Sequence, residues 1–287
     1  MNGIIILDKK EDISSFKAGN KVKHLIGAEK VGHTGTLDPL ATGVLPILVN
    51  NATKLSAIFI EKDKSYIATG RLGIKTDTGD ITGKVIEESK VSEFSFNSLT
   101  DIVNSFIGEY KYLPPMYSAI KQDGKKLYQL ARKNITVERQ ERLSIIHEIS
   151  LEDLYEIDNI KYFSIKVKAE KGLYVRSLIE DIAVKINTVA TMSALRRIAS
   201  GDFKIENSYT LEQIENSEYK LINLEELFKD FPKLEVNDYL ANLVKNGNLL
   251  DERQIKTESY FLVYNNNKLI AIYQPVKKYQ YRPLVML

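Results

Sequence analysis

The amino-acid sequence predicts an α+β protein with two domains, a large one over residues 1–230 and a small, β-rich one over residues 231–287. The first observation is length, because 287 residues suit a large domain joined to a small one. The second is periodicity, since apolar residues before residue 230 recur at helical spacing in some stretches and alternate as in strands in others. The third is a change of pattern after Phe231 and Pro232, where short strands are expected around residues 245–248 and 265–267.

The first half of the large domain contains three predicted strands and two predicted helices. Residues 4–7 form an apolar run that indicates a buried strand. Ser14 and Ser15 supply N-cap chemistry for a helix that ends at Gly27 and has an apolar face of Ala18, Val22, Leu25 and Ile26. Residues 65–74 predict a strand that pairs with residues 84–87 across a turn at residues 75–83. The next helix is capped by Asn97 or Ser98, ends at Gly108 and buries Leu99, Ile102, Val103, Phe106 and Ile107.

The remaining elements follow the same rules. Residues 163–169 alternate as a strand, and a helix over residues 177–187 follows with Arg176 at the junction. A cation at that end of a helix is not favoured by the helix dipole, so Arg176 needs an anionic partner elsewhere. Residues 200–203 predict a turn. In the small domain, residues 260–264 and 269–273 predict a hairpin.

Composition narrows the classes of protein to consider. Hydrophobic residues make up 44% of the chain and charged residues 27%, as in globular proteins, and no apolar run approaches the length of a membrane span. The N-terminus lacks the pattern of a signal peptide, so a cytoplasmic protein is expected. The absence of Cys excludes disulfides and thiolate chemistry, and the three scattered His residues predict no metal site. No periodic apolar seam suggests self-association, so we expect a monomer.

Residues 32–43 form a glycine-rich loop with one carboxylate at its centre. Gly32, Gly35 and Gly43 indicate tight turns, and Pro39 forces Asp38 into an extended conformation. The loop lacks the spacing of a nucleotide-binding motif. From the residues alone, Asp38 is either a turn former, which is the commoner use of Asp before Pro, or a side chain directed at a ligand. In the turn at residues 75–83, Asp77 and Asp80 lack the spacing of a calcium loop and are expected to form turns.

Residues 111–142 carry a local excess of positive charge although the whole chain has a net charge of only +2. Eight Lys and Arg residues stand against three acidic ones, Asp123, Glu138 and Glu141. Tyr112, Tyr117 and Tyr128 are interleaved with them. Cations that neutralise phosphates and aromatic rings that stack on bases suit an RNA-binding segment, whereas the alternative is a solvated loop and helix.

Several motifs together resemble those of the bacterial tRNA pseudouridine synthase B family over nearly the whole chain. Residues 32–46 resemble its catalytic motif, and Lys64 to Tyr66, Leu72 and Gly73, and residues 76–78 resemble the next. Residues 114–121, residues 124–128, and Ala131 with Arg132 resemble its RNA-gripping insertion, and residues 172–177 and 195–197 resemble the remaining site motifs. Departures are Lys10 where the family has Pro, Tyr112 for Gln, Leu173 for Thr and Thr191 for His.

The resemblance implies a fold and a reaction. The expected fold is a mixed, largely antiparallel sheet flanked by helices, followed by a small domain of the PUA type that binds RNA. The expected activity is isomerisation of uridine 55 in the T loop of tRNA to pseudouridine, with tRNA as partner and without cofactor or metal. The implied catalytic residues are Asp38, Tyr66 and Arg176, and the implied substrate-binding residues are His33, Tyr174, Leu195, Lys121, Lys125, Lys126 and Arg132.

Two other classes of protein would use the same residues differently. A non-catalytic RNA-binding or tRNA-folding factor would need the basic segment and the small domain and would leave Asp38 structural. A nucleobase hydrolase would need a second carboxylate to activate water. Asp38 has no acidic neighbour in its own loop, which favours isomerisation over hydrolysis.

Overall fold

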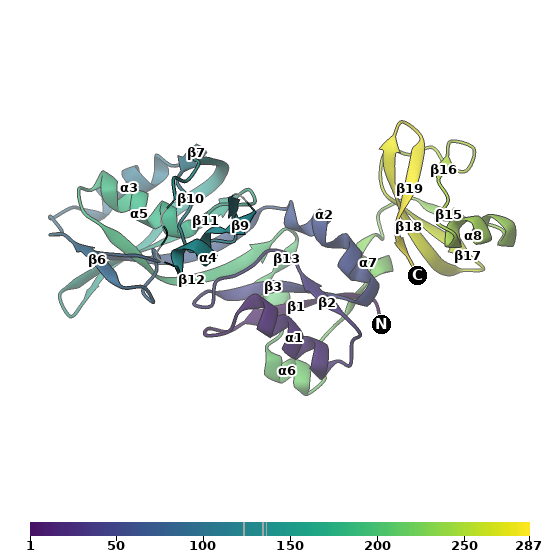
Figure 1. Cartoon of the computed structure of the whole chain (residues 1–287), viewed down its shortest axis with the longest axis horizontal. Helices are drawn as coiled ribbons and strands as arrows, with labels where there is room; N and C mark the ends of the chain where they lie inside the picture. The colour runs from purple at the N-terminus through teal and green to yellow at the C-terminus, as the bar shows by residue number, and fades with distance from the viewer. Residues whose placement is uncertain (123, 134, 136) are drawn as a thin grey trace.

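The computed structural model describes residues 1–122, 124–133, 135 and 137–287, and these residues form two large sheets and two separate two-stranded hairpins (Figure 1). The strands of the larger sheet are β1 (Gly3–Lys9), β2 (Val31–His33), β3 (Thr42–Val49), β4 (Lys64–Leu72), β7 (Gly108–Tyr112), β10 (Arg142–Ile157), β11 (Ile160–Ala169), β12 (Ala190–Ser200), β13 (Phe203–Lys204) and β14 (Ile222–Asn223). They follow the order β14, β1, β3, β12, β4, β11, β10, β7, with β2 paired to β3 and β13 paired to β12. Two hairpins lie outside this sheet, formed by β5 (Ile74–Thr76) with β6 (Val85–Glu88) and by β8 (Lys121–Gln122) with β9 (Lys125–Lys126).

Helices cover parts of this sheet. They are α1 (Ser15–Leu25), α2 (Ser56–Ile60), α3 (Phe96–Asn104), α4 (Leu127–Ala131), α5 (Val175–Lys185), α6 (Leu211–Glu215) and α7 (Leu224–Leu227), with 3-10 turns η1 (Asn50–Leu55) and η2 (Ile205–Asn207). Helices α3 and α5 pack against β10 and β12, whereas α1 and α6 lie beside β1 to β3 (Figure 1). Within the described residues, β3 and β12 pair in parallel and the other strands on the main path pair antiparallel. The expected mixed, largely antiparallel sheet is therefore confirmed.

The second sheet belongs to the C-terminal part of the chain. It consists of β15 (Lys233–Glu235), β16 (Leu250–Asp251), β17 (Phe261–Asn265), β18 (Lys268–Lys277) and β19 (Gln280–Met286), in the order β15, β17, β18, β19, β16, with helix α8 (Asp238–Lys245) beside it. The expected hairpin is confirmed by the pairing of β17 with β18. The expected short strand before residue 245 is wrong, because residues 238–245 form α8, which Asn237 caps through its side chain.

The apolar runs in β1 and β3 are continuous because both faces of these strands are buried. Leu7, Leu45 and Ile47 belong to the core of the large domain, and alternate residues such as Val44 and Leu48 belong to a second cluster. That second cluster also contains apolar residues of the C-terminal sheet: Leu262, Tyr264, Ile272 and Val285. Since successive side chains of a strand point to opposite faces, β3 links the two cores.

Several local predictions are confirmed and several are wrong. Ser14 caps α1, and Gly27 follows that helix with a φ of +63°. The strand expected at residues 65–74 ends at Leu72, because Gly73 has a φ of +88° and starts a separate hairpin. As a result β6 pairs with β5, while β4 pairs with β11 and β12.

The helix predictions need smaller corrections. Ser95 rather than Asn97 or Ser98 caps α3, and Ile107 lies exposed beyond its end. Leu25 lies on the exposed face of α1, and α5 ends at Lys185 instead of residue 187. No helix in the described part of the chain is both long enough and apolar enough to cross a membrane.

Candidate active site

The glycine-rich loop connects two strands that pair with each other. His33 in β2 pairs with Ile47 in β3, so residues 34–41 project from the end of this pair. Gly43 at the start of β3 has a φ of +100°, and a Cβ atom there would lie 2.2 Å from the carbonyl oxygen of Arg197. Only glycine fits this position. The approach of β12 to β3 therefore fixes one end of the loop.

Asp38 forms an ion pair with Arg176, which lies more than a hundred residues later in the sequence. The distance from Oδ2 of Asp38 to Nη2 of Arg176 is 2.9 Å. Arg176 lies in the first turn of α5 and is only 4% exposed, whereas 36% of the Asp38 side chain is exposed. The carboxylate thus has a buried cation on one side and an open side from which a substrate can approach.

The guanidinium of Arg176 is held by further acceptors. Its Nη1 donates to the carbonyl of Thr78 at 2.7 Å, and its Nη2 donates to the carbonyl of Tyr117 at 2.9 Å. Oδ2 of the buried Asp80 lies 3.9 Å from Nη1. The planar fork of an arginine can satisfy several acceptors at fixed angles, so these groups set its orientation toward Asp38.

Asp80 was expected to form a turn, and it does, but it also belongs to the site. Its Oδ1 accepts hydrogen bonds from the hydroxyl groups of Thr78 and Thr82 and from the Thr82 N–H. The sequence carries no signal that the hairpin loop after β5 packs against α5. A contact of this kind depends on tertiary structure, which periodicity along the chain does not report.

Lys9 is a second cation near Asp38 and was not predicted. It is 1% exposed, and its Nζ donates to the carbonyls of Lys10, Ile13 and Pro39 at 2.9, 2.8 and 3.1 Å. Burial lowers the pKa of Lys9 to about 8, although the charge of Asp38 acts to raise it. A signal for it exists in the sequence, because strand alternation places Lys9 on the same side of β1 as the buried Leu7.

The cations around Asp38 oppose the effect of its burial on its pKa. Burial raises the pKa of Asp38, the neighbouring Arg176 lowers it, the nearby Asp80 raises it and Lys9 lowers it. The net direction is upward. A carboxylate in this setting is poorly solvated and stays reactive when it is ionised, which suits a group that must act directly on a substrate.

Tyr66 and Arg197 are cross-strand neighbours on β4 and β12. Arg197 is fully buried, and it donates from Nε to the carbonyl of Val44 at 2.7 Å and from Nη2 to the carbonyl of Gly35 at 3.2 Å. Burial lowers the pKa of Arg197, whereas the adjacent Tyr66 phenol raises it. The half-buried Tyr66 therefore has its phenol beside a buried cation at the base of the loop.

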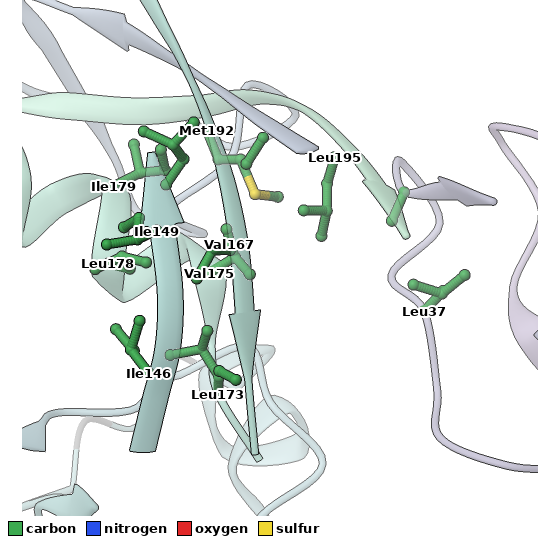
Figure 2. Packing of buried hydrophobic residues seen from close by; sticks show 14 of the residues in the cluster. Leu37, Ile146, Ile149, Val167, Leu173, Val175, Leu178, Ile179, Met192 and Leu195 are labelled. Carbon is green, nitrogen blue, oxygen red and sulfur yellow. The ribbon is translucent and has the colours of Figure 1, made fainter. Parts of the chain in front are cut away.

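His33, Tyr174 and Leu195 lie on three different elements around the same loop. Burial lowers the pKa of His33, and Arg197 nearby lowers it further, so this imidazole favours the neutral form. Burial raises the pKa of Tyr174, whose phenol is close enough to Asp38 and Arg176 for their charges to contribute. Leu195 belongs to the same apolar cluster as Leu37 of the loop and lies between Leu37 and Met192 in the view of Figure 2.

The residues of the basic segment, residues 111–142, differ in their exposure to solvent. Lys121, Lys125 and Arg132 are exposed and Lys126 is partly exposed. The cationic groups of Lys126 and Arg132 lie 5.7 and 5.4 Å from the centroid of the Tyr128 ring. Asp123, counted in the charge of this segment, lies outside the described residues.

Tyr112 does not match its predicted environment. Its side chain is buried in β7 against Tyr110 and Tyr174, so the expectation that it belongs to a surface that stacks on bases is wrong. The physical reason is strand alternation, which directs Tyr110 and Tyr112 to the same inner face of the sheet.

Comparison with known proteins gives consistent matches along the chain. Residues 23–175 match the model of the TruB family pseudouridylate synthase N-terminal domain, and residues 176–245 match that of the tRNA pseudouridylate synthase B C-terminal domain. The chain is 41% identical over 284 residues to tRNA pseudouridine synthase B of Clostridium tetani, with 97% of each chain covered. It is 39% identical over 279 residues to the protein of the same name from Francisella tularensis subsp. novicida, covering 95% of this chain and 90% of the relative.

Solved structures show a similar fold. A Cbf5-Nop10-Gar1 complex contains a chain that matches with a TM-score of 0.68 at 24% identity, covering 96% of this chain and 79% of the other. An H/ACA RNP bound to a substrate RNA containing 2'-deoxyuridine contains a chain that matches with a TM-score of 0.63 at 22% identity, covering 99% and 83%. The match in sequence over nearly the full length of its relatives places this chain in the TruB family of pseudouridylate synthases.

Proposed function

We propose that this chain isomerises a uridine of tRNA to pseudouridine, at position 55 of the T loop. The observation that carries the proposal is the Asp38–Arg176 ion pair of 2.9 Å, which holds one partly exposed carboxylate against a buried cation. Membership of the TruB family and the name of the two relatives, tRNA pseudouridine synthase B, support the same reaction. The proposal keeps the expectation from the sequence that the isomerisation proceeds without a cofactor.

The reaction breaks the bond between C1′ of the ribose and N1 of the uracil. The uracil then turns, a bond forms between C1′ and C5, the C5 proton leaves to a base, and N1 gains a proton. The atoms of substrate and product are the same. Asp38 acts as the nucleophile in its ionised form, and the bond that it forms to the substrate breaks again before the product leaves, which regenerates the carboxylate. Arg176 stabilises the ionised form and orients it.

The uridine must leave the stacked loop of the RNA to reach Asp38. Tyr66 lies in the sheet beside the loop with its phenol near Arg197, and it stacks on the uracil and takes part in removal of the C5 proton. Neutral His33 occupies the space that the flipped base leaves, and Tyr174 and Leu195 line the pocket. Each of these roles is part of the proposal.

The surroundings of Asp38 favour isomerisation over hydrolysis. A hydrolase would need a second carboxylate free to activate water. Among the described residues near Asp38, Asp80 is the candidate, and its Oδ1 already accepts three hydrogen bonds while its Oδ2 faces Arg176. Asp80 is therefore engaged in holding the arginine.

The RNA contacts involve two regions of the chain. Lys121, Lys125, Lys126 and Arg132 neutralise phosphates of the T arm, which their exposure permits. We divide the chain after residue 230, so that residues 231–287 form a PUA-like domain that also binds RNA, and the sheet that begins at Lys233 supports this division. The protein acts as a monomer in the cytoplasm, where tRNA is modified.

The experiment compares the wild-type protein with Asp38→Asn and Asp12→Asn on a tRNA transcript. Asp12 is a matched control because it is exposed, its N–H contacts Pro39 of the same loop, and Asn tolerates its φ of +61°. Affinity is measured by filter binding, and pseudouridine and free uracil are quantified after nuclease digestion. We expect pseudouridine from the wild type and from Asp12→Asn, and none from Asp38→Asn at similar affinity.

Other outcomes would identify the other classes of protein. Full conversion by Asp38→Asn would remove this carboxylate from the reaction. Free uracil from the wild type would indicate a hydrolase. Tight binding by the wild type with no change in the RNA would indicate a non-catalytic RNA-binding or tRNA-folding factor.

A further inference from the structure

Tyr112 is a buried tyrosine inside a segment whose basic residues face solvent. It is the last residue of β7 and pairs with Arg142 of β10. Only 3% of it is exposed, and its burial raises its pKa to about 12, so its phenol stays protonated and can act as a donor. None of the roles proposed above uses this group.

The ring of Tyr112 contacts the rings of Tyr110 and Tyr174 in a column of aromatic side chains that begins at Phe106. It stacks on Tyr110 with centroids 5.1 Å apart and an interplanar angle of 12°, and it meets the ring of Tyr174 at 6.3 Å and 48°. The Tyr110 hydroxyl donates to Oδ2 of Asp181 on α5 at 2.5 Å. The column therefore joins the body of α5 to the tyrosine that lies just before this helix.

The hydroxyl of Tyr112 contacts the same turn at a second point. It donates a hydrogen bond to the carbonyl of Gly172. The turn from Gly172 to Tyr174 leads directly into the first turn of α5, where Arg176 lies. Tyr174, the N-cap residue of α5, makes no side-chain cap hydrogen bond, and Gly172 has a φ of +88°. Contacts from outside the turn must therefore hold it in place, and Tyr112 supplies two of them.

We propose that Tyr112 is a positioning residue for the isomerisation, which fixes the Tyr174 ring and the entry to α5 by its ring contact and its bond to Gly172. This inference rests on the proposed function. It predicts that loss of Tyr112 contacts slows the chemical step while RNA affinity is kept. A residue that only fills the core would change thermal stability and leave the rate of the folded protein unchanged.

Two variants of Tyr112 separate its hydrogen bond from its ring contacts, and a third variant at another position serves as a control. Tyr112→Phe removes the hydroxyl and keeps the ring, whereas Tyr112→Leu removes both contacts. Tyr155→Leu is the matched control, because Tyr155 stacks on Tyr162 at 5.5 Å and 13° in the distant β10–β11 ribbon of the same sheet. All are compared well below their unfolding temperatures, in single-turnover reactions with saturating tRNA and in filter-binding titrations.

We expect the single-turnover rate of Tyr112→Leu to fall by roughly ten- to a hundredfold, because small misplacements of reacting groups have effects of this size. Tyr112→Phe should lie between it and the wild type. Tyr155→Leu should match the wild type, and the dissociation constants for tRNA should all be similar. A Tyr112→Leu rate equal to that of the control, or a loss confined to RNA affinity, would overturn the proposal.

A second measurement does not depend on activity. Hydrogen exchange followed by mass spectrometry should show faster exchange in Tyr112→Phe for the peptide that covers residues 172–178, with no change in the β17–β18 hairpin. Unchanged exchange in residues 172–178 would overturn the positioning role even if the variant were slow. A wild-type protein that forms no pseudouridine would instead refute the proposed function, so the two failures are distinguishable.

Discussion

Replacing Arg176 with Met tests the central ion pair of the site. Met keeps much of the length of the side chain and removes the charge and the donors. Four acceptors then lose their partner: the carboxylates of Asp38 and Asp80 and the carbonyls of Thr78 and Tyr117. We expect a strong loss of both catalysis and stability, because the groups left behind are largely withdrawn from water.

The size of the expected loss of stability follows from the burial of the ion pair. Removing one partner of a buried ion pair costs about 3–5 kcal/mol. Arg176 is only 4% exposed, but 36% of the Asp38 side chain is, so water offsets part of the loss at that carboxylate and the lower end, about 3 kcal/mol, is the better expectation. For a protein of this size, that corresponds to a fall in unfolding temperature of roughly 6–12 °C.

The stability and the activity of Arg176→Met should also depend on pH in a defined direction. Burial already raises the pKa of Asp38, and loss of Arg176 removes the largest influence that lowers it. The folded variant then binds a proton on Asp38 at pH values where the unfolded chain does not. Relative to the wild type, stability must therefore increase as the pH falls through the raised pKa, and activity must decrease over the same range because it needs the ionised carboxylate.

The assay combines thermal unfolding at several pH values with single-turnover rates on tRNA. Arg176→Lys is the control, because it restores a positive charge without the planar fork, and it should recover part of the pH response but few of the hydrogen bonds. The reasoning fails if Arg176→Met unfolds within 1–2 °C of the wild type. It also fails if acidification from pH 7 to 5 does not stabilise that variant relative to the wild type, in which His33 makes the same contribution.

Three further predictions concern other parts of the site. Tyr66→Phe should bind tRNA normally and react about a hundredfold or more slowly if its phenol moves a proton; an unchanged rate would exclude that role. Replacing Lys125 and Lys126 together with Ala should lower the slope of log affinity against log salt by roughly 1–2, while the exposed Lys229→Ala serves as a control with the wild-type slope. Gly43→Ala should unfold at a markedly lower temperature, because its Cβ would lie 2.2 Å from a backbone oxygen of β12; wild-type stability by calorimetry would contradict that geometry.

The sequence predicts local structure where the cause is local. The N-cap at Ser14, the left-handed Gly27 and the β17–β18 hairpin depend on neighbouring residues, and all are confirmed. One wrong assignment arises where a distant segment contributes. Strand β4 ends at Leu72, which is also the last residue that pairs with β12, a strand far along the chain.

The candidate site shows the same division between features with a local cause and features that depend on distant segments. Asp38 and Arg176 were expected together only through the family motifs, since spacing alone left Asp38 undecided between a turn former and a ligand-directed group. Lys9 could have been recognised from strand alternation, because it shares a side of β1 with Leu7. Asp80 could not, because its role depends on the hairpin loop that reaches Arg176 across the domain. The burial of Tyr112 follows from alternation as well, but the surrounding positive charge pointed to solvent.

The environment of Asp38 explains why such a loop needs a large supporting structure. Lys9 donates to Pro39 on one side of Asp38, Arg197 donates to Gly35 on the other, and Arg176 contacts the carboxylate itself. Each of these cations is almost fully buried, and burying a charge is costly unless backbone carbonyls or carboxylates accept its hydrogen bonds.

That cost must be offset by packing elsewhere. Strand β3, which begins at the end of the loop, contributes alternate side chains to the core of the large domain and to the cluster shared with the C-terminal sheet. Apolar burial on both faces of one strand is a large stabilising contribution. The C-terminal sheet therefore helps to support the strand that follows the glycine-rich loop, in addition to any contact that it makes with RNA.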